Sequence, residues 1–204
     1  MDMGLSRLQN AIVDMANLAQ QSVMKAIEAY TKGERITQEA LDRANELSMI
    51  ATEVQELAVE LLARYQPVAT DLRFIKSCLE IAYGFSRFGR YAYDIAQVLE
   101  IYGDLTQCDK TAVENLSVKV TTMIQTSIKS FNNRDEKLAR SLRQLDDEVD
   151  QVYLDYNRQL AKGKAIPIPC ALASVLVLRY LERIADHACY IGDSVIYITT
   201  ATKI

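Results

Sequence analysis

The sequence predicts an all-α protein made of six long helices, arranged as two three-helix bundles in tandem. Its 204 residues include only 3 prolines and 7 glycines, which leaves long stretches without a helix breaker. Apolar residues recur at intervals of three and four along these stretches, which is the spacing of one helix face. The chain also contains an internal repeat, and a repeated unit of three helices accounts for it.

The first half of the chain contains three predicted helices. The first covers about 4–31 and ends near Gly33. The second covers about 37–66 and stops there, because the residue before Pro67 is disfavoured in the α-helical region. The third opens with Pro67, which the first turn of a helix tolerates, and it ends near Gly103.

The second half follows the same plan. A fourth helix is predicted over 111–131. A turn formed by 162–164, Pro167 and Pro169 separates a fifth helix from a sixth, which runs to about Thr199. The fifth helix carries an unbroken apolar seam whose spacings alternate between four and three residues. The seam consists of Leu138, Leu142, Leu145, Val149, Val152 and Tyr156.

The internal repeat relates the third predicted helix to the sixth. Segment 85–97 aligns with segment 181–193, and the two share an arginine, an alanine and an isoleucine at equivalent positions. We therefore expect one three-helix unit over 1–104 and a second over 105–204. Helices of about 30 residues reach roughly 45 Å, so each unit is expected to be elongated.

Composition and charge exclude several classes of function. The net charge is −4 and the chain has no long basic run, which argues against nucleic acid as the main partner. No run of about 18 apolar residues is present and the N-terminus lacks the layout of a signal peptide, so we expect a cytoplasmic protein. The four cysteines are Cys78, Cys108, Cys170 and Cys189. They form no Cys-x-x-Cys motif, so we expect reduced, mostly buried thiols and no zinc–thiolate site.

Two pairs of carboxylates mark the fifth and sixth predicted helices. Asp146 and Asp150 are one helical turn apart, as are Glu182 and Asp186, so each pair shares one helix face. If the connecting turn is centred near Ala165, a rise of about 1.5 Å per residue brings the two pairs to the same height on antiparallel helices. Four converging acids repel one another, and a bound cation removes that cost. The pattern therefore predicts a metal site with oxygen ligands, which suits hard cations such as Mg²⁺, Mn²⁺, Ca²⁺ or ferric iron.

Two other interpretations remain open for these acids. In the first, they are solvated on the surface of a plain helical scaffold without metal. In the second, they belong to a carboxylate-ligated metalloenzyme, such as an iron oxidase or a phosphohydrolase. Di-iron bundles of the ferritin type need two Glu-x-x-His pairs, and this chain has a single histidine, His187. No nucleophile with a paired base stands out either, so a non-enzymatic protein is the expectation.

Three segments of the sequence resemble the PhoU family, whose members regulate phosphate uptake. Residues 61–82 contain a Gln-Pro-x-Ala-x-Asp-Leu-Arg motif that begins at Gln66. Residues 181–188 contain a Leu-Glu-Arg-Ile-x-Asp motif, and residues 145–153 contain the matching acidic motif of the fifth helix. The resemblance implies two three-helix bundles. It also implies bound metal, as multinuclear iron in some members, so iron is the expected cofactor, with Mg, Mn, Ca or Zn as alternatives.

The resemblance also implies which residues hold the metal. In the second unit the implied ligands are Asp146, Asp150, Glu182 and Asp186. The equivalent positions of the first unit carry no acid, since they are Ala44, Ser48, Ser86 and Arg90. We therefore expect one metal site where intact members of the family would have two. Asp94 lies one turn beyond Arg90, and we expect these two side chains to pair.

The resemblance further implies negative control of phosphate uptake. The expected partners are the ATPase of a phosphate ABC transporter, a sensor histidine kinase, or both. Long amphipathic helices also leave room for a homodimer. Four basic residues of the third predicted helix would offer a face to an acidic partner or to a nearby membrane surface, although a solvated face is the simpler interpretation. These residues are Arg73, Lys76, Arg87 and Arg90.

Overall fold

The computed structural model describes residues 1–163 and 165–202, and within these ranges it contains six α-helices and no β-strand. The helices are α1 (Asp2–Lys32), α2 (Thr37–Tyr65), α3 (Ala69–Tyr102), α4 (Thr111–Asn133), α5 (Glu136–Ala161) and α6 (Ile168–Thr200). The all-α prediction is confirmed, and each helix lies within a few residues of its predicted range. Lys164, which the sequence assigned to the turn before α6, lies outside the described residues.

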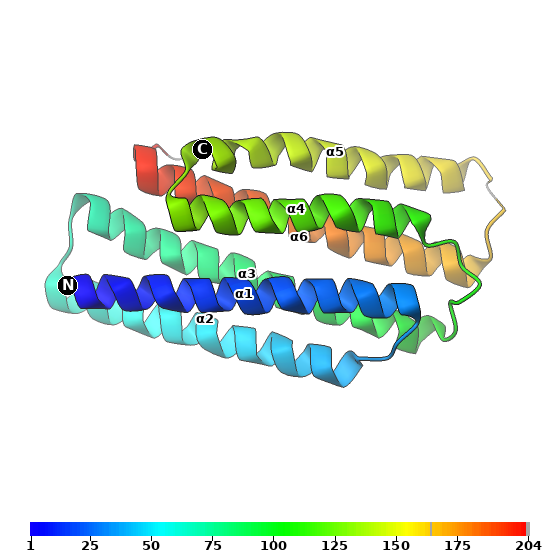
Figure 1. The fold of residues 1–204 in the computed structure, drawn as a ribbon, viewed down its shortest axis with the longest axis horizontal. Coiled ribbons are helices and arrows are strands. Elements are labelled where there is room, and N and C mark those ends of the chain that lie inside the picture. The colour runs from blue at the N-terminus through cyan, green and yellow to red at the C-terminus, as the bar shows by residue number, and fades with distance from the viewer. Residues whose placement is uncertain (164, 203–204) are drawn as a thin grey trace.

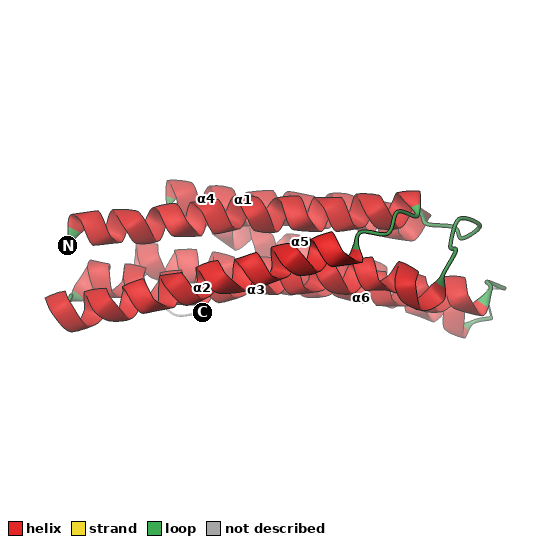
Figure 2. Ribbon diagram, turned by 90° about the horizontal axis from the view of Figure 1, so that it is seen from below, coloured by secondary structure: helices red, strands yellow, loops and turns green. Residues whose placement is uncertain are grey.

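The six helices form two three-helix bundles that lie side by side along their length (Figure 1). α3 packs against both α1 and α2, and α6 packs against both α4 and α5. α3 and α6 also pack against each other, so they form the centre of the molecule. Figure 2 shows α1 and α4 together on one side of this central pair and makes the elongated shape visible. The predicted tandem arrangement is therefore confirmed.

Two of the prolines lie elsewhere than the sequence predicted. α3 does not open with Pro67, because Gln66 and Ala69 both adopt positive φ angles, 45° and 50°, and the chain makes a separate turn between them before the helix begins. Pro169 was assigned to the turn before α6, and it lies instead in the first turn of that helix. A missing N–H costs nothing there, because the first N–H groups of a helix have no partner within it.

The core follows the apolar stripes of the sequence. The stripe on α6 is buried along its whole length, and it consists of Leu181, Ile184, Ala188, Ile191, Val195 and Ile198. On α3, the fully buried rings of Phe85 and Phe88 meet edge to face with centroids 5.6 Å apart. Helices approach closely at glycines: a Cβ on Gly192 would lie 2.7 Å from Leu142 Cδ1. α5 and α6 are therefore in close contact one to two turns from the carboxylate pairs.

Candidate metal centre

The four predicted ligands lie on two neighbouring antiparallel helices. Asp146 and Asp150 are on α5, and Glu182 and Asp186 are on α6, against which α5 packs. All four are close enough to influence one another, because the charges of Asp146, Asp150 and Asp186 each raise the pKa of Glu182. The structure thus brings the two pairs to one region between the helices, as the residue counting predicted.

A cross-helix ion pair supports this register. The Arg143 Nη2 atom donates to both carboxylate oxygens of Asp193, at 3.0 Å each. Arg143 lies three residues before Asp146 on α5, and Asp193 lies seven residues after Asp186 on α6. Gly192 and Leu142 touch at the same height. Both contacts belong to the antiparallel alignment in which Asp146 is level with Asp186.

Burial and mutual repulsion set the electrostatics of the four acids. Burial, followed by the charge of Asp186, raises the pKa of Glu182 to about 7. Burial and the charges of Asp186 and Asp150 raise the pKa of Asp146 to about 6. The pKa values of Asp150 and Asp186 are also raised, in both cases chiefly by burial. Every member of the cluster is therefore easier to protonate than an ordinary carboxylate, which is typical of a site that lacks enough positive charge.

Two arginines of α6 supply part of the missing charge. Arg179 Nη1 donates to Glu182 Oε1, and Arg183 Nη1 lies 3.0 Å from Asp186 Oδ2. Arg183 Nε is also 3.5 Å from Glu182 Oε2. These arginines hold the two α6 carboxylates in place. Within the described residues, no three His, Cys, Asp or Glu side chains stand close enough together to bind a metal ion.

Two buried carboxylate oxygens of the cluster could nevertheless accept a contact from a cation or a proton. Among the described residues, Asp146 Oδ1 and Glu182 Oε2 are buried side-chain atoms that accept no hydrogen bond. A buried carboxylate oxygen without a hydrogen bond is costly, and a cation or a proton satisfies it. For Glu182 Oε2, the ion pair with Arg183 offsets part of that cost. The donor set consists of carboxylates alone, which is the chemistry that hard cations prefer. Arg179 and Arg183 occupy two of these carboxylates, so a cation would have to displace their guanidinium groups.

The pH dependence of stability provides a test of this electrostatic picture. The folded pKa of Glu182, about 7, lies above its ordinary value of 4.5. The folded state therefore binds more protons than the unfolded state between these pH values, so this group stabilises the fold below about 4.5, and that stabilisation is lost as the pH rises through about 7. In metal-free buffer, the free energy of unfolding should fall from pH 5 to pH 8 by more in the wild type than in Glu182→Gln. Chemical denaturation at the two pH values measures this, and equal falls in both proteins would contradict it.

The equivalent region of the first bundle is built differently. Arg90 of α3 pairs with Asp94 at 3.2 Å, which confirms the predicted ion pair, and its guanidinium lies 5.2 Å from the ring centroid of Tyr93. Burial raises the pKa of Asp94, and Arg90 opposes that rise. A fixed guanidinium therefore supplies the positive charge on this side. The nearest equivalents on α2, Ala44 and Ser48, offer no carboxylate.

Two of the four charges on the predicted basic face, those of Lys76 and Arg90, are paired with acids of α3, whereas Arg73 Nη2 donates to the hydroxyl of Thr70 at 3.2 Å. Lys76 lies 3.1 Å from Glu80, and Arg90 pairs with Asp94. Arg87 donates to the hydroxyl of Tyr91 at 3.0 Å and stacks over its ring. These contacts favour the interpretation of this face as an ordinary solvated helix surface.

His187 packs against three aromatic rings. Its ring contacts those of Tyr83, Tyr91 and Tyr190, with centroids 5.8, 5.9 and 6.4 Å apart. Burial and the charge of Arg87 lower its pKa. The neutral imidazole therefore lies in an aromatic cluster on the α3 side of α6. The predicted ligands on the α5 side are carboxylates, and His187 is not one of them.

The expectation of four reduced cysteines is wrong for two of them. Cys108 and Cys170 form a disulfide across a sequence separation of 62 residues, whereas Cys78 and Cys189 are free thiols. Spacing along the chain carries no sign of this pair, because it arises only when the segment between α3 and α4 passes the start of α6.

No described helix is long and apolar enough to cross a membrane.

Comparison with known proteins identifies relatives over nearly the whole chain. The family model described as the PhoU domain matches residues 12–99 and 113–195, one match in each bundle. A phosphate-specific transport system accessory protein PhoU homolog 1 of Methanothermobacter thermautotrophicus is 31% identical over 74% of this chain and 71% of its own. The protein of the same name from Thermotoga maritima is 28% identical over 96% of this chain and 87% of its own. The crystal structure of PhoU from Pseudomonas aeruginosa superposes with a TM-score of 0.91 at 28% identity, covering 98% of this chain and 99% of that one.

Proposed function

This chain belongs to the PhoU family, and from that premise we propose that it is a non-enzymatic accessory protein of a phosphate-specific transport system that restrains phosphate uptake. The observation that carries the proposal is the match of the PhoU domain to both bundles, together with relatives named as accessory proteins of phosphate transport. The protein would act in the cytoplasm, by contact with the ATPase of the transporter, with a sensor histidine kinase, or with both.

The metal centre is the second part of the proposal. Asp146, Asp150, Glu182 and Asp186 would hold one hard cation, with iron expected and Mg, Mn, Ca or Zn as alternatives. The buried oxygens of Asp146 and Glu182 that accept no hydrogen bond and the raised pKa values of all four acids support this assignment. When bound, the cation supplies positive charge at the contact between α5 and α6. The carboxylates orient it, and Arg179 and Arg183 would exchange their internal ion pairs for contacts with solvent or with a partner.

This exchange suggests how the metal would affect partner binding. Without a cation, Arg179 and Arg183 are engaged by Glu182 and Asp186. With a cation, the same carboxylates would serve as ligands, and the two guanidinium groups would become available beside the site. Arginine is enriched at protein interfaces because its planar guanidinium pairs well with carboxylates. An acidic surface on the partner protein would therefore recognise the metal-loaded form.

Uptake measurements in the source organism test the proposed function. Deletion of the gene is expected to raise the uptake of radiolabelled phosphate in phosphate-rich medium, and the wild-type chain is expected to restore the low rate. A tagged wild-type chain should co-purify with the transporter ATPase or the sensor kinase. Glu182→Ala/Asp186→Ala should restore uptake control poorly, while Glu56→Ala/Glu60→Ala, an exposed acidic pair on α2, should behave as the wild type. Unchanged uptake after the deletion would contradict the proposal.

A further inference from the structure

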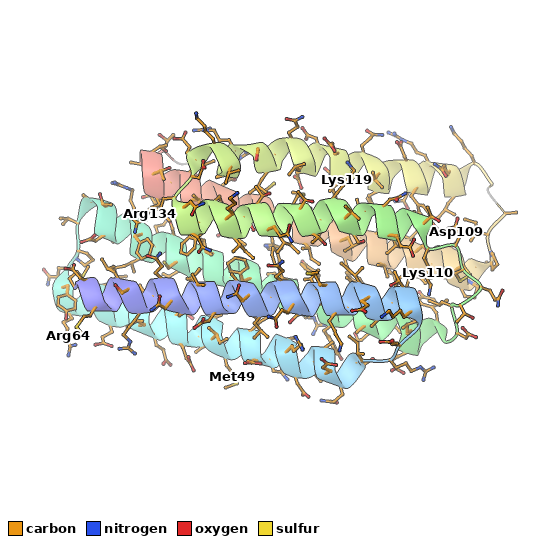
Figure 3. The ribbon with its side chains drawn as sticks, in the orientation of Figure 1. Met49, Arg64, Asp109, Lys110, Lys119 and Arg134 are labelled. Carbon is orange, nitrogen blue, oxygen red and sulfur yellow. A yellow bond between two sulfur atoms is a disulfide. The ribbon has the colours of Figure 1, made fainter. Side chains whose placement is uncertain are left out.

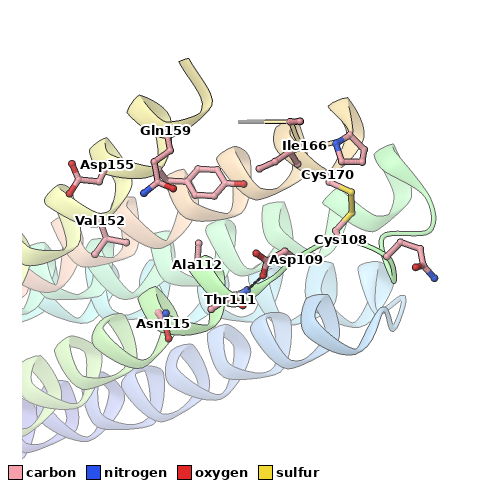
Figure 4. A pocket seen from close by; sticks show the side chains of 14 residues that line it. Cys108, Asp109, Thr111, Ala112, Asn115, Val152, Asp155, Gln159, Ile166 and Cys170 are labelled. Carbon is pink, nitrogen blue, oxygen red and sulfur yellow. Dashed lines mark hydrogen bonds between the residues drawn. A yellow bond between two sulfur atoms is a disulfide. The ribbon is translucent and has the colours of Figure 1, made fainter. Parts of the chain in front are cut away.

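The Cys108–Cys170 disulfide occupies the end of the molecule where the two bundles are joined. Cys108 lies in the segment between α3 and α4, and Cys170 is the third residue of α6 (Figure 4). The ring that the bond closes contains all of α4 and α5. The bond therefore ties the α4–α5 hairpin covalently to the start of α6.

The segment that carries Cys108 is also fastened to the first bundle. Lys110 Nζ donates to the backbone oxygens of Tyr30 and Thr31 at the end of α1, at 2.9 Å each, and lies 5.4 Å from the ring centroid of Tyr30. Leu105 is buried in the core. Figure 3 shows Asp109 and Lys110 side by side at this end of the molecule. The disulfide thus completes a junction between α1, α6 and the connecting segment.

A cavity of about 610 Å³ lies against the disulfide and makes it reachable. Both cysteines line it, together with side chains from α4, α5 and the segment before α6, among them Asn115, Tyr156 and Pro167 (Figure 4). The cavity is large enough for a low-molecular-weight thiol. Cys108 is half-buried, whereas Cys170 is only 8% exposed, so a thiol that enters the cavity meets the sulfur of Cys108 more readily.

The position of Cys170 decides which sulfur leaves. Cys170 lies in the first turn of α6, where the helix dipole and the free N–H groups stabilise a thiolate. In thiol–disulfide exchange, the sulfur with the more stable thiolate leaves faster. Attack on Cys108 with departure of Cys170 is therefore the favoured direction, on grounds of both access and charge.

We propose that Cys108–Cys170 is a site of reversible thiol–disulfide exchange with a low-molecular-weight thiol, and that its redox state sets the stability of the junction between the bundles. A small thiolate attacks Cys108 Sγ, the bond between the two protein sulfurs breaks, and Cys170 leaves as a thiolate that then takes up a proton. A second small thiol attacks the mixed disulfide on Cys108 and releases Cys108 as a thiol. The balance is one protein disulfide and two small thiols giving two protein thiols and one small-molecule disulfide. This inference rests on the cytoplasmic location of the proposed function, because a reducing compartment favours a reversible role of this kind over a permanent structural bond.

Redox titration of the full-length protein tests this proposal. The chain is equilibrated in buffers of varied ratio of reduced to oxidised glutathione, then alkylated in denaturant and mapped by mass spectrometry. Cys108 and Cys170 should become protected together in the oxidising buffers, while Cys78 and Cys189 stay alkylated. Reduction should lower Tm by about 5–15 °C, because the bond closes a long loop. Absence of the Cys108–Cys170 cross-link at every ratio, or a cross-link whose reduction leaves Tm unchanged, would overturn the proposal.

Two serine variants separate the roles of the cysteines. Cys189→Ser should keep the redox-dependent Tm shift, and Cys108→Ser should lose it. When the oxidised wild type is mixed with reduced glutathione and the reaction is quenched with acid, the trapped mixed disulfide should carry glutathione on Cys108 at least tenfold more often than on Cys170. Equal adducts on the two sulfurs would overturn the assigned direction of attack. Because the wild-type titration needs no substitution, the test holds even if one variant folds poorly.

Discussion

Replacing Glu182 and Asp186 together by alanine is expected to lower the affinity of the chain for a hard divalent or ferric cation by more than about 100-fold. The double variant removes both carboxylates of α6 and leaves Asp146 and Asp150, which alone cannot surround an ion. The fold should survive, because the apolar stripe of α6 is separate from the acids. Isothermal titration with Mn²⁺ and elemental analysis of protein purified without chelator measure the loss.

The matched control for this variant is Glu56→Ala/Glu60→Ala. These residues also form an acidic pair one turn apart, but both are exposed on α2, and no acidic pair is predicted opposite them. Its metal content should equal that of the wild type, at about one ion per chain. Equal metal content in the wild type and in Glu182→Ala/Asp186→Ala would show that these carboxylates hold no metal.

Truncation of Phe85 is expected to cause the largest loss of stability. Phe85 is fully buried on α3, which packs against α1, α2 and α6 and so supports both bundles. Phe85→Ala removes a ring that packs edge to face on Phe88 and leaves a cavity, so the free energy of unfolding should fall by about 3–5 kcal/mol. Urea denaturation monitored by circular dichroism gives the value.

Tyr83 provides the comparison for Phe85 on the same helix. Its side chain is 54% exposed and contacts the rings of His187 and Tyr190 at the surface. Tyr83→Ala should therefore cost less than about 1 kcal/mol. Similar losses for the two variants would mean that α3 does not form the centre of a core shared by the bundles.

Much of the fold could be predicted because its signals are local. The left-handed conformations that end α1 and α2 fall at Gly33 and at Gln66, the residue before Pro67. The six-residue stripe on α6 is buried as its spacing predicts. The height of the two carboxylate pairs could also be predicted, because α5 and α6 are long helices joined by a short turn. Residues that are equally far from this turn lie at the same height on the two helices.

Other features depend on contacts that no local pattern encodes. The Cys108–Cys170 bond needs the three-dimensional path of the segment between the bundles, since its cysteines are 62 residues apart. Glu182 is only 7% exposed, and the one-turn spacing of the acidic pair does not indicate this burial. The pairing of Arg179 and Arg183 with the acids depends on side-chain conformation, which helix periodicity leaves undetermined.

The internal repeat shows which positions of the two bundles are equivalent and that the acids are present in the second bundle alone. The same helical framework places Arg90 where the second bundle has Asp186. A guanidinium paired with Asp94 gives the first bundle a positive charge that is part of the chain, whereas under the proposed function the second bundle would take its positive charge from an exchangeable cation. This difference would make metal binding a signal from the second bundle alone.

Anomalous diffraction from crystals of protein purified without chelator tests the metal site most directly. The account predicts one anomalous peak between α5 and α6, within coordination distance of Asp146, Asp150, Glu182 and Asp186, and no peak beside Arg90. Crystals that diffract well and show no peak between α5 and α6, even after soaking in Mn²⁺, would contradict it.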